Sequence, residues 1–352
     1  MNSPAQPNST RAIANNYDVW PGGHFEWDSV ADFLDNEIWL DGVHTIGLGS
    51  GPALDIFFSG NPLSGPGRTL PVFFNGAITG REGKAGPFFS GRKIAAAGGF
   101  GFLAISDPSV DLDPTLGLAW YAGSAHQNLQ DSLAALLQEI SKRGSRELLL
   151  IGGSGGGFAS LLYGDRLGNA ASVLVWNPQT SVTDYNPIFV KNYVVQALCS
   201  DADLDGEDWK LVARAQADRY GIVLDALKSH PRRLLYMQNG SDWHTPVHAV
   251  PFLRAGAFGH EGNGIYRTDE DHVVWVANYG NGHAPLPEKA LLGALELLMD
   301  PEMTVHEVVR QLRRTLAAEA GAISPGWPRV SDVLPLDTEL YDLATAVTDT
   351  VA

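Results

Sequence analysis

The residues 148–162, LLLIGGSGGGFASLL, place five glycines around a single serine. The apolar run before them predicts a buried strand, and the pattern after them predicts a helix. Glycine is disfavoured inside both kinds of element, so this density predicts a tight turn in which side chains do not fit. A strand, a tight turn and a helix in succession indicate an α/β fold.

Three chemistries use a glycine-rich turn between a strand and a helix. A phosphate-binding Walker loop needs Lys at position 158, and a dinucleotide-binding fingerprint needs Gly there, but the residue is Phe158. The nucleophile elbow, G-x-S-x-G, matches residues 152–156 without a mismatch. The alternative interpretation is an ordinary tight turn in which Ser154 is incidental.

In the elbow interpretation, Ser154 is the nucleophile and sits on a strained turn that projects its hydroxyl above the sheet. The amide of Gly155, at the start of the helix, would stabilise an oxyanion. The second oxyanion donor is expected after the strand in residues 69–78, where Gly76 and Ala77 are the candidates. An ordinary Asn-Gly turn is the alternative for that loop.

A serine nucleophile needs a base and a group that orients the base. Proteins that carry the nucleophile elbow supply these residues in the chain order Ser, Asp or Glu, His. His283 follows the predicted strand 272–280 in a glycine-flanked loop, so it is the predicted base. Asp242 follows the predicted strand 232–240 and is the predicted acid. The alternatives are a surface or packing role for the histidine, one of ten in the chain, and a local turn role for the aspartate.

A metal site is a second interpretation of part of this region. His244 and His248 are four residues apart and close to Asp242, but the glutamate of the H-E-x-x-H motif is absent. The Thr245-Pro246 pair is typical of a helix start. We therefore expect no metal and no other cofactor, and we expect His244 to line the substrate pocket.

Short apolar runs alternate with helical patterns along most of the chain, which predicts a mostly parallel, doubly wound sheet covered on both faces. The predicted strands are residues 69–78, 100–108, 147–153, 171–179, 232–240 and 272–280. The predicted organisation is a disordered arm (1–16), a catalytic domain (17–300) with a helical lid insertion (181–232), and a C-terminal helix and tail (301–352).

The insertion is longer than a simple crossover requires, and two helical patterns lie within it. We predict that the first helix covers the Ser154 pocket and that Phe189 and Tyr193 contact the substrate. The alternative is that both helices pack on the sheet as ordinary crossovers. The run 177–179, Asn-Pro-Gln, is interpreted as a lid hinge or as strand punctuation.

Charge narrows the classes of partner. The 352 residues include 24 Lys and Arg against 40 Asp and Glu, a net charge of −16, which argues against nucleic acid or an anionic membrane as partner. The only cysteine is Cys199, so no intrachain disulfide can form. Neither a signal peptide nor a membrane span is visible, and we expect a cytoplasmic protein. The sequence does not indicate the oligomeric state.

Residues 69–300 resemble the α/β-hydrolase superfamily, through the elbow at 152–156 together with Asp242 and His283. A narrower likeness, in segments such as VFFNGAI, GGSGGGFAS and NPQT, is to a branch found with bacterial surface-polysaccharide and accessory-secretion systems. That resemblance implies a serine esterase or a glycan O-acetyltransferase. The sequence departs from the superfamily in having no HGGG-type motif for the second oxyanion donor.

The expected function is a serine-dependent acyl hydrolase that acts, through an acyl-enzyme, on a small-molecule ester or an acylated carbohydrate. An O-acyltransferase would use the same acyl-enzyme and differ only in whether water or a sugar hydroxyl resolves it. A third alternative is a catalytically silent scaffold in a secretion or polysaccharide assembly complex.

Overall fold

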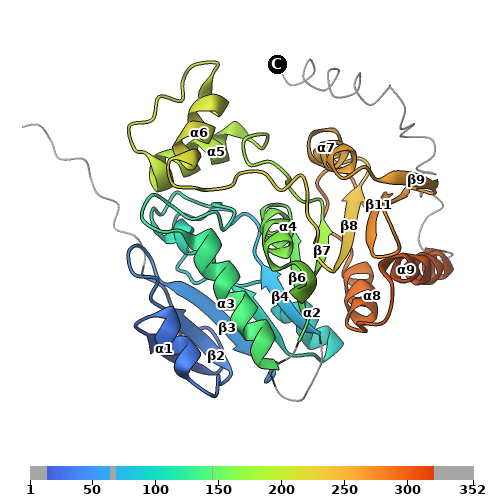
Figure 1. The fold of residues 1–352 in the computed structure, drawn as a ribbon, viewed down its shortest axis with the longest axis horizontal. Coiled ribbons are helices and arrows are strands. Elements are labelled where there is room, and N and C mark those ends of the chain that lie inside the picture. The colour runs from blue at the N-terminus through green and yellow to red at the C-terminus, as the bar shows by residue number, and fades with distance from the viewer. Residues whose placement is uncertain (1–13, 64–68, 145, 321–352) are drawn as a thin grey trace, which may run out of the picture.

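The computed structural model describes residues 14–63, 69–144 and 146–320. Its centre is an 11-stranded sheet in the order β1-β2-β3-β5-β4-β6-β7-β8-β11-β10-β9 (Figure 1). The strands are β1 (Gly23–Trp27), β2 (Gly42–Ile46), β3 (Leu54–Ser59), β4 (Leu70–Phe74), β5 (Phe102–Ile105), β6 (Leu148–Gly153), β7 (Ala171–Trp176), β8 (Arg233–Asn239), β9 (Gly259–Gly262), β10 (Ile265–Arg267) and β11 (His272–Ala277).

The centre of the sheet is parallel, as predicted. Strands β5, β4, β6, β7, β8 and β11 run in one direction, and each of the six lies within a strand expected from the sequence. The margins add antiparallel pairs: β3 runs against both β2 and β5, and β10 runs against β11 and β9. The β9–β10 pair is joined by Asn263 and Gly264, whose φ angles of 53° and 72° suit a tight hairpin turn.

Helices cover both faces of the sheet because the buried side chains of each strand alternate between two cores. On β6, Leu148 and Leu150 join one core, whereas Leu149 and Ile151 join the other. The first face carries α1 (Val30–Asp35), α3 (Leu129–Gly144), α4 (Gly155–Leu167) and α7 (Val250–Ala255), and the second carries α2 (Arg92–Gly98), α8 (Glu288–Leu298) and α9 (Val305–Ala320). The structure is therefore the doubly wound α/β architecture that the sequence predicts.

The predicted insertion holds two helices, α5 (Pro187–Tyr193) and α6 (Trp209–Asp218), which lie together at the upper edge of Figure 1. One turn of π-helix, Val194–Leu198, extends α5. Helix α6 ends before Gly221, because Gly221 adopts a φ of 67°, which a right-handed helix does not allow. The apolar face of α5 joins the same core as α3 and α4.

Shorter helical segments connect the main elements. They are the 3₁₀ segments Pro108–Asp111 and Gly168–Ala170 and a turn of π-helix at Thr245–Ala249, which leads into α7. None of the helices in the described ranges is long and apolar enough to cross a membrane.

Residues near both ends of the described part of the chain contact the domain. Asn15 and Asn16, at the end of the predicted arm, are held against the domain, because the Asn15 side chain donates hydrogen bonds to Asp55 and Asp111 (3.3 and 3.1 Å). Helix α9 packs against α8, β8 and β11, and its apolar residues belong to the second core. The rest of the predicted arm, 1–13, and the tail beyond residue 320 lie outside the described residues.

Candidate active site

The turn between β6 and α4 has the geometry of a nucleophile elbow. Ser154 lies alone between the two elements with φ 54° and ψ −120°, a strained conformation for a residue with a side chain. A Cβ added at Gly152 would lie 2.2 Å from the carbonyl oxygen of Gly156, so the two sides of the turn meet backbone to backbone. The N–H of Gly155 is in the first turn of α4, where no carbonyl within the helix can accept it.

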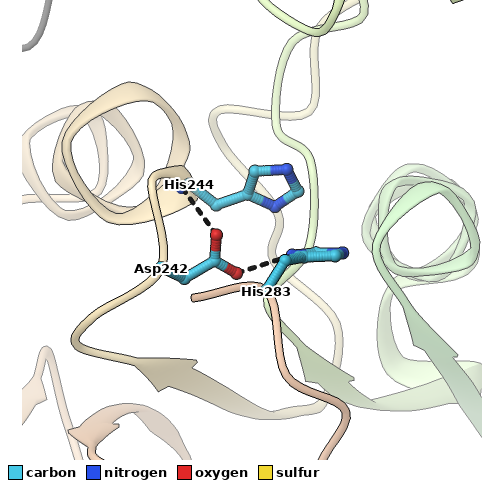
Figure 2. Close-up of side chains that lie close together, drawn as sticks. All are labelled: Asp242, His244 and His283. Atoms are coloured by element: carbon cyan, nitrogen blue, oxygen red, sulfur yellow. Dashed lines mark hydrogen bonds and ion pairs between the residues drawn. The ribbon is translucent and has the colours of Figure 1, made fainter. Parts of the chain in front are cut away.

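Asp242 and His283 form a close pair at the same end of the sheet (Figure 2). The Nδ1 atom of His283 lies 2.6 Å from Oδ2 of Asp242, and the Asp242 side chain is completely buried. The other carboxylate oxygen accepts the backbone N–H of His244 at 3.0 Å. When Nδ1–H of His283 donates to this carboxylate, Nε2 remains on the opposite edge of the ring, away from Asp242.

Two buried asparagines position the loop that carries His283. Asn239, the last residue of β8, donates from Nδ2 to the carbonyls of Gly280 and Gly282 (3.0 and 2.7 Å). Asn177, which follows β7, donates from Nδ2 to the carbonyl of Ala284 (2.8 Å) and accepts the N–H of Asn239 at Oδ1 (2.7 Å). These hydrogen bonds connect the ends of β7 and β8 to the backbone on both sides of His283.

Ser154 and His283 line one cavity of about 450 Å³. Its walls come from the ends of the central strands and from α2 and α8, and Trp176 and Leu286 are among its apolar lining. At its rim, Lys93 forms an ion pair with Glu288 across the gap between these helices. A cavity of this size accommodates a small ligand, and Ser154 and the imidazole of His283 both line it.

The loop after β4 passes beside the elbow. Gly76 lines the same cavity, and a Cβ added to it would lie 4.0 Å from Cβ of Ser154. The backbone N–H groups of Asn75 and Ile78 donate hydrogen bonds of 2.7 and 2.8 Å. The backbone N–H groups of the two intervening residues, Gly76 and Ala77, have no acceptor within the described part of the chain. Of these two residues, Gly76 lies next to the serine and lines the cavity, whereas Ala77 does not line it.

His244 does not line this cavity, which corrects the expectation from the sequence. Its side chain is fully buried behind the Asp242–His283 pair, with its ring centre 4.3 Å from that of His283. Nδ1 of His244 donates to the carbonyl of Asn177 (3.0 Å). Burial lowers the pKa of His244 to about 4, so the ring is neutral at pH 7.

Phe189 and Tyr193 do not line this cavity either. Tyr193 is fully buried, and its hydroxyl donates to the carbonyl of Gly123 at 2.9 Å, which is the environment of a core residue. Phe189 is half-buried and packs against the ring of Tyr185 at 5.6 Å between ring centres. The physical reason is that α5 packs into the core shared with α3 and α4, whereas the cavity is walled by α2 and α8.

The side chains around Asp242 also include residue types that bind metal ions. One ligand atom from each of Asp242, His244 and His283 lies within 4.8 Å of the others. Metal binding at Nδ1 of His283 competes with the hydrogen bond between His283 and Asp242. The reason is that Nδ1 cannot bind a metal while it carries the proton that it donates. His248, the other histidine considered from the sequence, accepts the N–H of Thr180 at Nδ1 (3.2 Å).

Gln179 is the residue near the serine that sequence reasoning missed. Its side-chain Nε2 donates to Oγ of Ser154 at 3.0 Å. From the sequence alone, the Asn-Pro-Gln run indicates only a hinge or strand punctuation. The available signal was its position, because polar residues that follow a parallel strand reach the same sheet edge as the elbow.

No protein-family model matches the sequence, and no curated protein sequence matches it. Among solved structures, an acetyl xylan esterase from Thermoanaerobacterium is similar over 75% of this chain and 83% of its own, at 13% identity and a TM-score of 0.46. A capsule O-acetyltransferase of Neisseria meningitidis is similar over 80% and 95% (13% identity, TM-score 0.42). An S-formylglutathione hydrolase from Agrobacterium tumefaciens is similar over 70% and 88% (13% identity, TM-score 0.43).

The architecture of this chain identifies its fold independently of those likenesses. The parallel strands β5, β4, β6, β7, β8 and β11 lie side by side, with β3 antiparallel at their margin and helices on both faces. A strained serine follows the central strand β6, and an acid and a histidine follow β8 and β11 in that chain order. The protein has the α/β-hydrolase fold, as its sequence motifs led us to expect.

Proposed function

We propose that the protein is a serine-dependent acyl hydrolase in which Ser154 is the nucleophile, His283 the base and Asp242 the group that orients the base. The observation that carries the proposal is that the serine of a strained elbow and an imidazole held by a buried carboxylate face the same cavity. The elbow geometry and the chain order of the three residues support it.

In the first half of the reaction, Oγ of Ser154 forms a bond to the ester carbonyl carbon while its proton passes to Nε2 of His283. The carbonyl π electrons move to the oxygen, which the amides of Gly155 and of Gly76 or Ala77 stabilise. Collapse of this intermediate breaks the bond to the alcohol, which takes the proton from His283. Ser154 is then acylated.

In the second half, water attacks the acyl carbon and gives its proton to His283. Collapse releases the carboxylic acid, and the proton returns to Oγ of Ser154. A sugar hydroxyl in place of water would give a transferase with the same residues. The cavity of about 450 Å³ has room for a small-molecule ester at the serine.

The test is a screen of short-chain acyl esters and acetylated glycans with the wild type and with Ser154→Ala. We expect Ser154→Ala to lower turnover about 10⁴- to 10⁶-fold while the melting temperature is retained. Labelling of the wild type by a fluorophosphonate, with the adduct mapped to Ser154, is the direct check. Turnover at a tenth of the wild-type rate in Ser154→Ala would contradict the assignment, and a wild type without labelling would support the scaffold alternative.

Adding a sugar acceptor to the same reaction separates the two acyl-transfer outcomes. A hydrolase releases acid at a rate that the acceptor does not change, whereas a transferase forms the acylated sugar. Product analysis by mass spectrometry measures both.

A further inference from the structure

Gln179 contacts the elbow through both its backbone and its side chain. Its N–H donates to the carbonyl of Ser154 at 3.1 Å, and its Nε2 donates to Oγ of the same serine at 3.0 Å. The residue has no exposed surface. A buried amide that bonds to the reacting atom of the proposed nucleophile is placed to take part in the reaction.

The orientation of this amide is fixed by a tryptophan. Nε1 of Trp120 forms a hydrogen bond with Oε1 of Gln179. An indole N–H can only donate, so the oxygen of the amide must face Trp120 and its NH₂ group must face Ser154. Trp120 is itself fully buried, with its ring packed edge-on against Tyr193 at 5.7 Å and against Tyr185 at 6.0 Å. The donor is therefore held in place before any substrate binds.

We propose, on the basis of the proposed function, that Gln179 is a further catalytic residue whose side-chain N–H stabilises Oγ of Ser154 whenever that atom gains negative charge. In the resting enzyme the bond occupies a lone pair of Oγ and leaves the hydroxyl proton free to point to His283. During acylation the proton leaves Oγ for Nε2 of His283 as the bond to carbon forms. During deacylation Oγ leaves the acyl carbon with the bonding electrons and regains the proton.

In both steps the hydrogen bond from Gln179 becomes a bond to a partly charged oxygen. Hydrogen bonds to charged groups are stronger than bonds between neutral groups, so the bond contributes more in the transition state than before it. Removing it should slow the chemistry by roughly 10- to 100-fold. Because Gln179 is buried behind the serine, the same change should leave substrate affinity nearly unaltered.

A purely structural role predicts a different result, and Gln130 provides a matched control. Gln130 on α3 is also buried, and its side chain bonds to both backbone groups of Val223, with Nε2 to the carbonyl at 2.8 Å and Oε1 to the N–H at 3.1 Å. Replacing either glutamine by Met keeps the length of the side chain and removes its hydrogen bonds. Gln130→Met should therefore lower stability without changing the chemistry at Ser154.

The experiment measures the second-order rate constant and the final stoichiometry of fluorophosphonate labelling, with the kcat and KM of the best ester. We expect Gln179→Met to reach full labelling at a rate about 10- to 100-fold below the wild type, with kcat lowered and KM unchanged. Gln130→Met should label at the wild-type rate. Wild-type labelling kinetics in folded Gln179→Met would overturn the proposal, as would an equal loss of rate in Gln130→Met.

Gln179→Glu provides a second, independent variant if Gln179→Met does not fold. An ionised Glu cannot donate to Oγ, but a protonated one can, so its labelling rate relative to the wild type should rise as the pH falls from about 8 to 6. A ratio that does not change with pH would contradict the donor role. Failure of the proposed function itself looks different, because then the wild type would not be labelled or Ser154→Ala would be labelled equally.

Discussion

Gly152→Ala is the substitution that most directly tests how the glycines build the site. The new Cβ would lie 2.2 Å from the oxygen and 2.3 Å from the carbon of the Gly156 carbonyl, against 3.4–4 Å for ordinary contact. The turn is therefore about 1 Å too tight for a methyl group. Both colliding partners are backbone atoms, so neither side can rotate away, and the first turn of α4 must shift.

The cost follows from that displacement. Overpacking in a core costs about 1–3 kcal/mol, and a clash with rigid backbone belongs at the upper end, about 3 kcal/mol. At roughly 2 °C per kcal/mol for a chain of this size, the melting temperature should fall by about 6 °C. A shift of about 1 Å in Ser154 and the Gly155 amide should also lower kcat/KM about 100-fold.

Thermal unfolding by circular dichroism and the fluorophosphonate labelling rate measure the two effects. The matched control is Gly206→Ala, because a Cβ at Gly206 meets no atom within 4 Å and its φ is not positive. We expect the control to change the melting temperature and the rate very little. If Gly152→Ala matched the control in both measurements, the close approach at the elbow would be refuted.

Three further predictions concern residues around the site. Asp242→Asn should lower kcat about 10⁴-fold, because His283 loses the carboxylate that holds its proton on Nδ1; steady-state kinetics measure this, and near-wild-type activity would exclude the orienting role. Burial lowers the pKa of His244 from 6.5 to about 4, so the unfolded chain binds more protons between these values and stability should rise with pH across them, by about 3 kcal/mol. Melting curves from pH 4 to 7 should show a shallower rise in His244→Gln, and an unchanged slope would argue against a buried neutral ring. Tyr193→Phe should cost about 1–3 kcal/mol through the unpaired carbonyl of Gly123 and leave KM unchanged; a raised KM would restore the substrate-contact role expected from the sequence.

Contacts between distant segments were beyond what the sequence could predict. The pattern around Gln179 shows only that a polar residue follows a strand, and its bond to Ser154 depends on β7 lying beside β6 in register. His244 was expected in the pocket because it is polar and near Asp242, yet its ring is turned inward to the carbonyl of Asn177. Tyr193 is an aromatic residue of the kind expected on a lid. It lies in the core instead of the cavity because α5 packs against that core.

What the sequence determined by itself is the part of this protein that is encoded locally. Apolar runs and helical periodicity specified the central parallel strands and most helices, and the glycines at 152–156 specified the elbow because a turn that tight excludes side chains on both sides. Only the tertiary structure decided the antiparallel margins of the sheet, the buried position of His244, the donor facing Ser154 and the cavity between α2 and α8. These features depend on which distant surfaces meet, and a local pattern fixes the elements but not their partners.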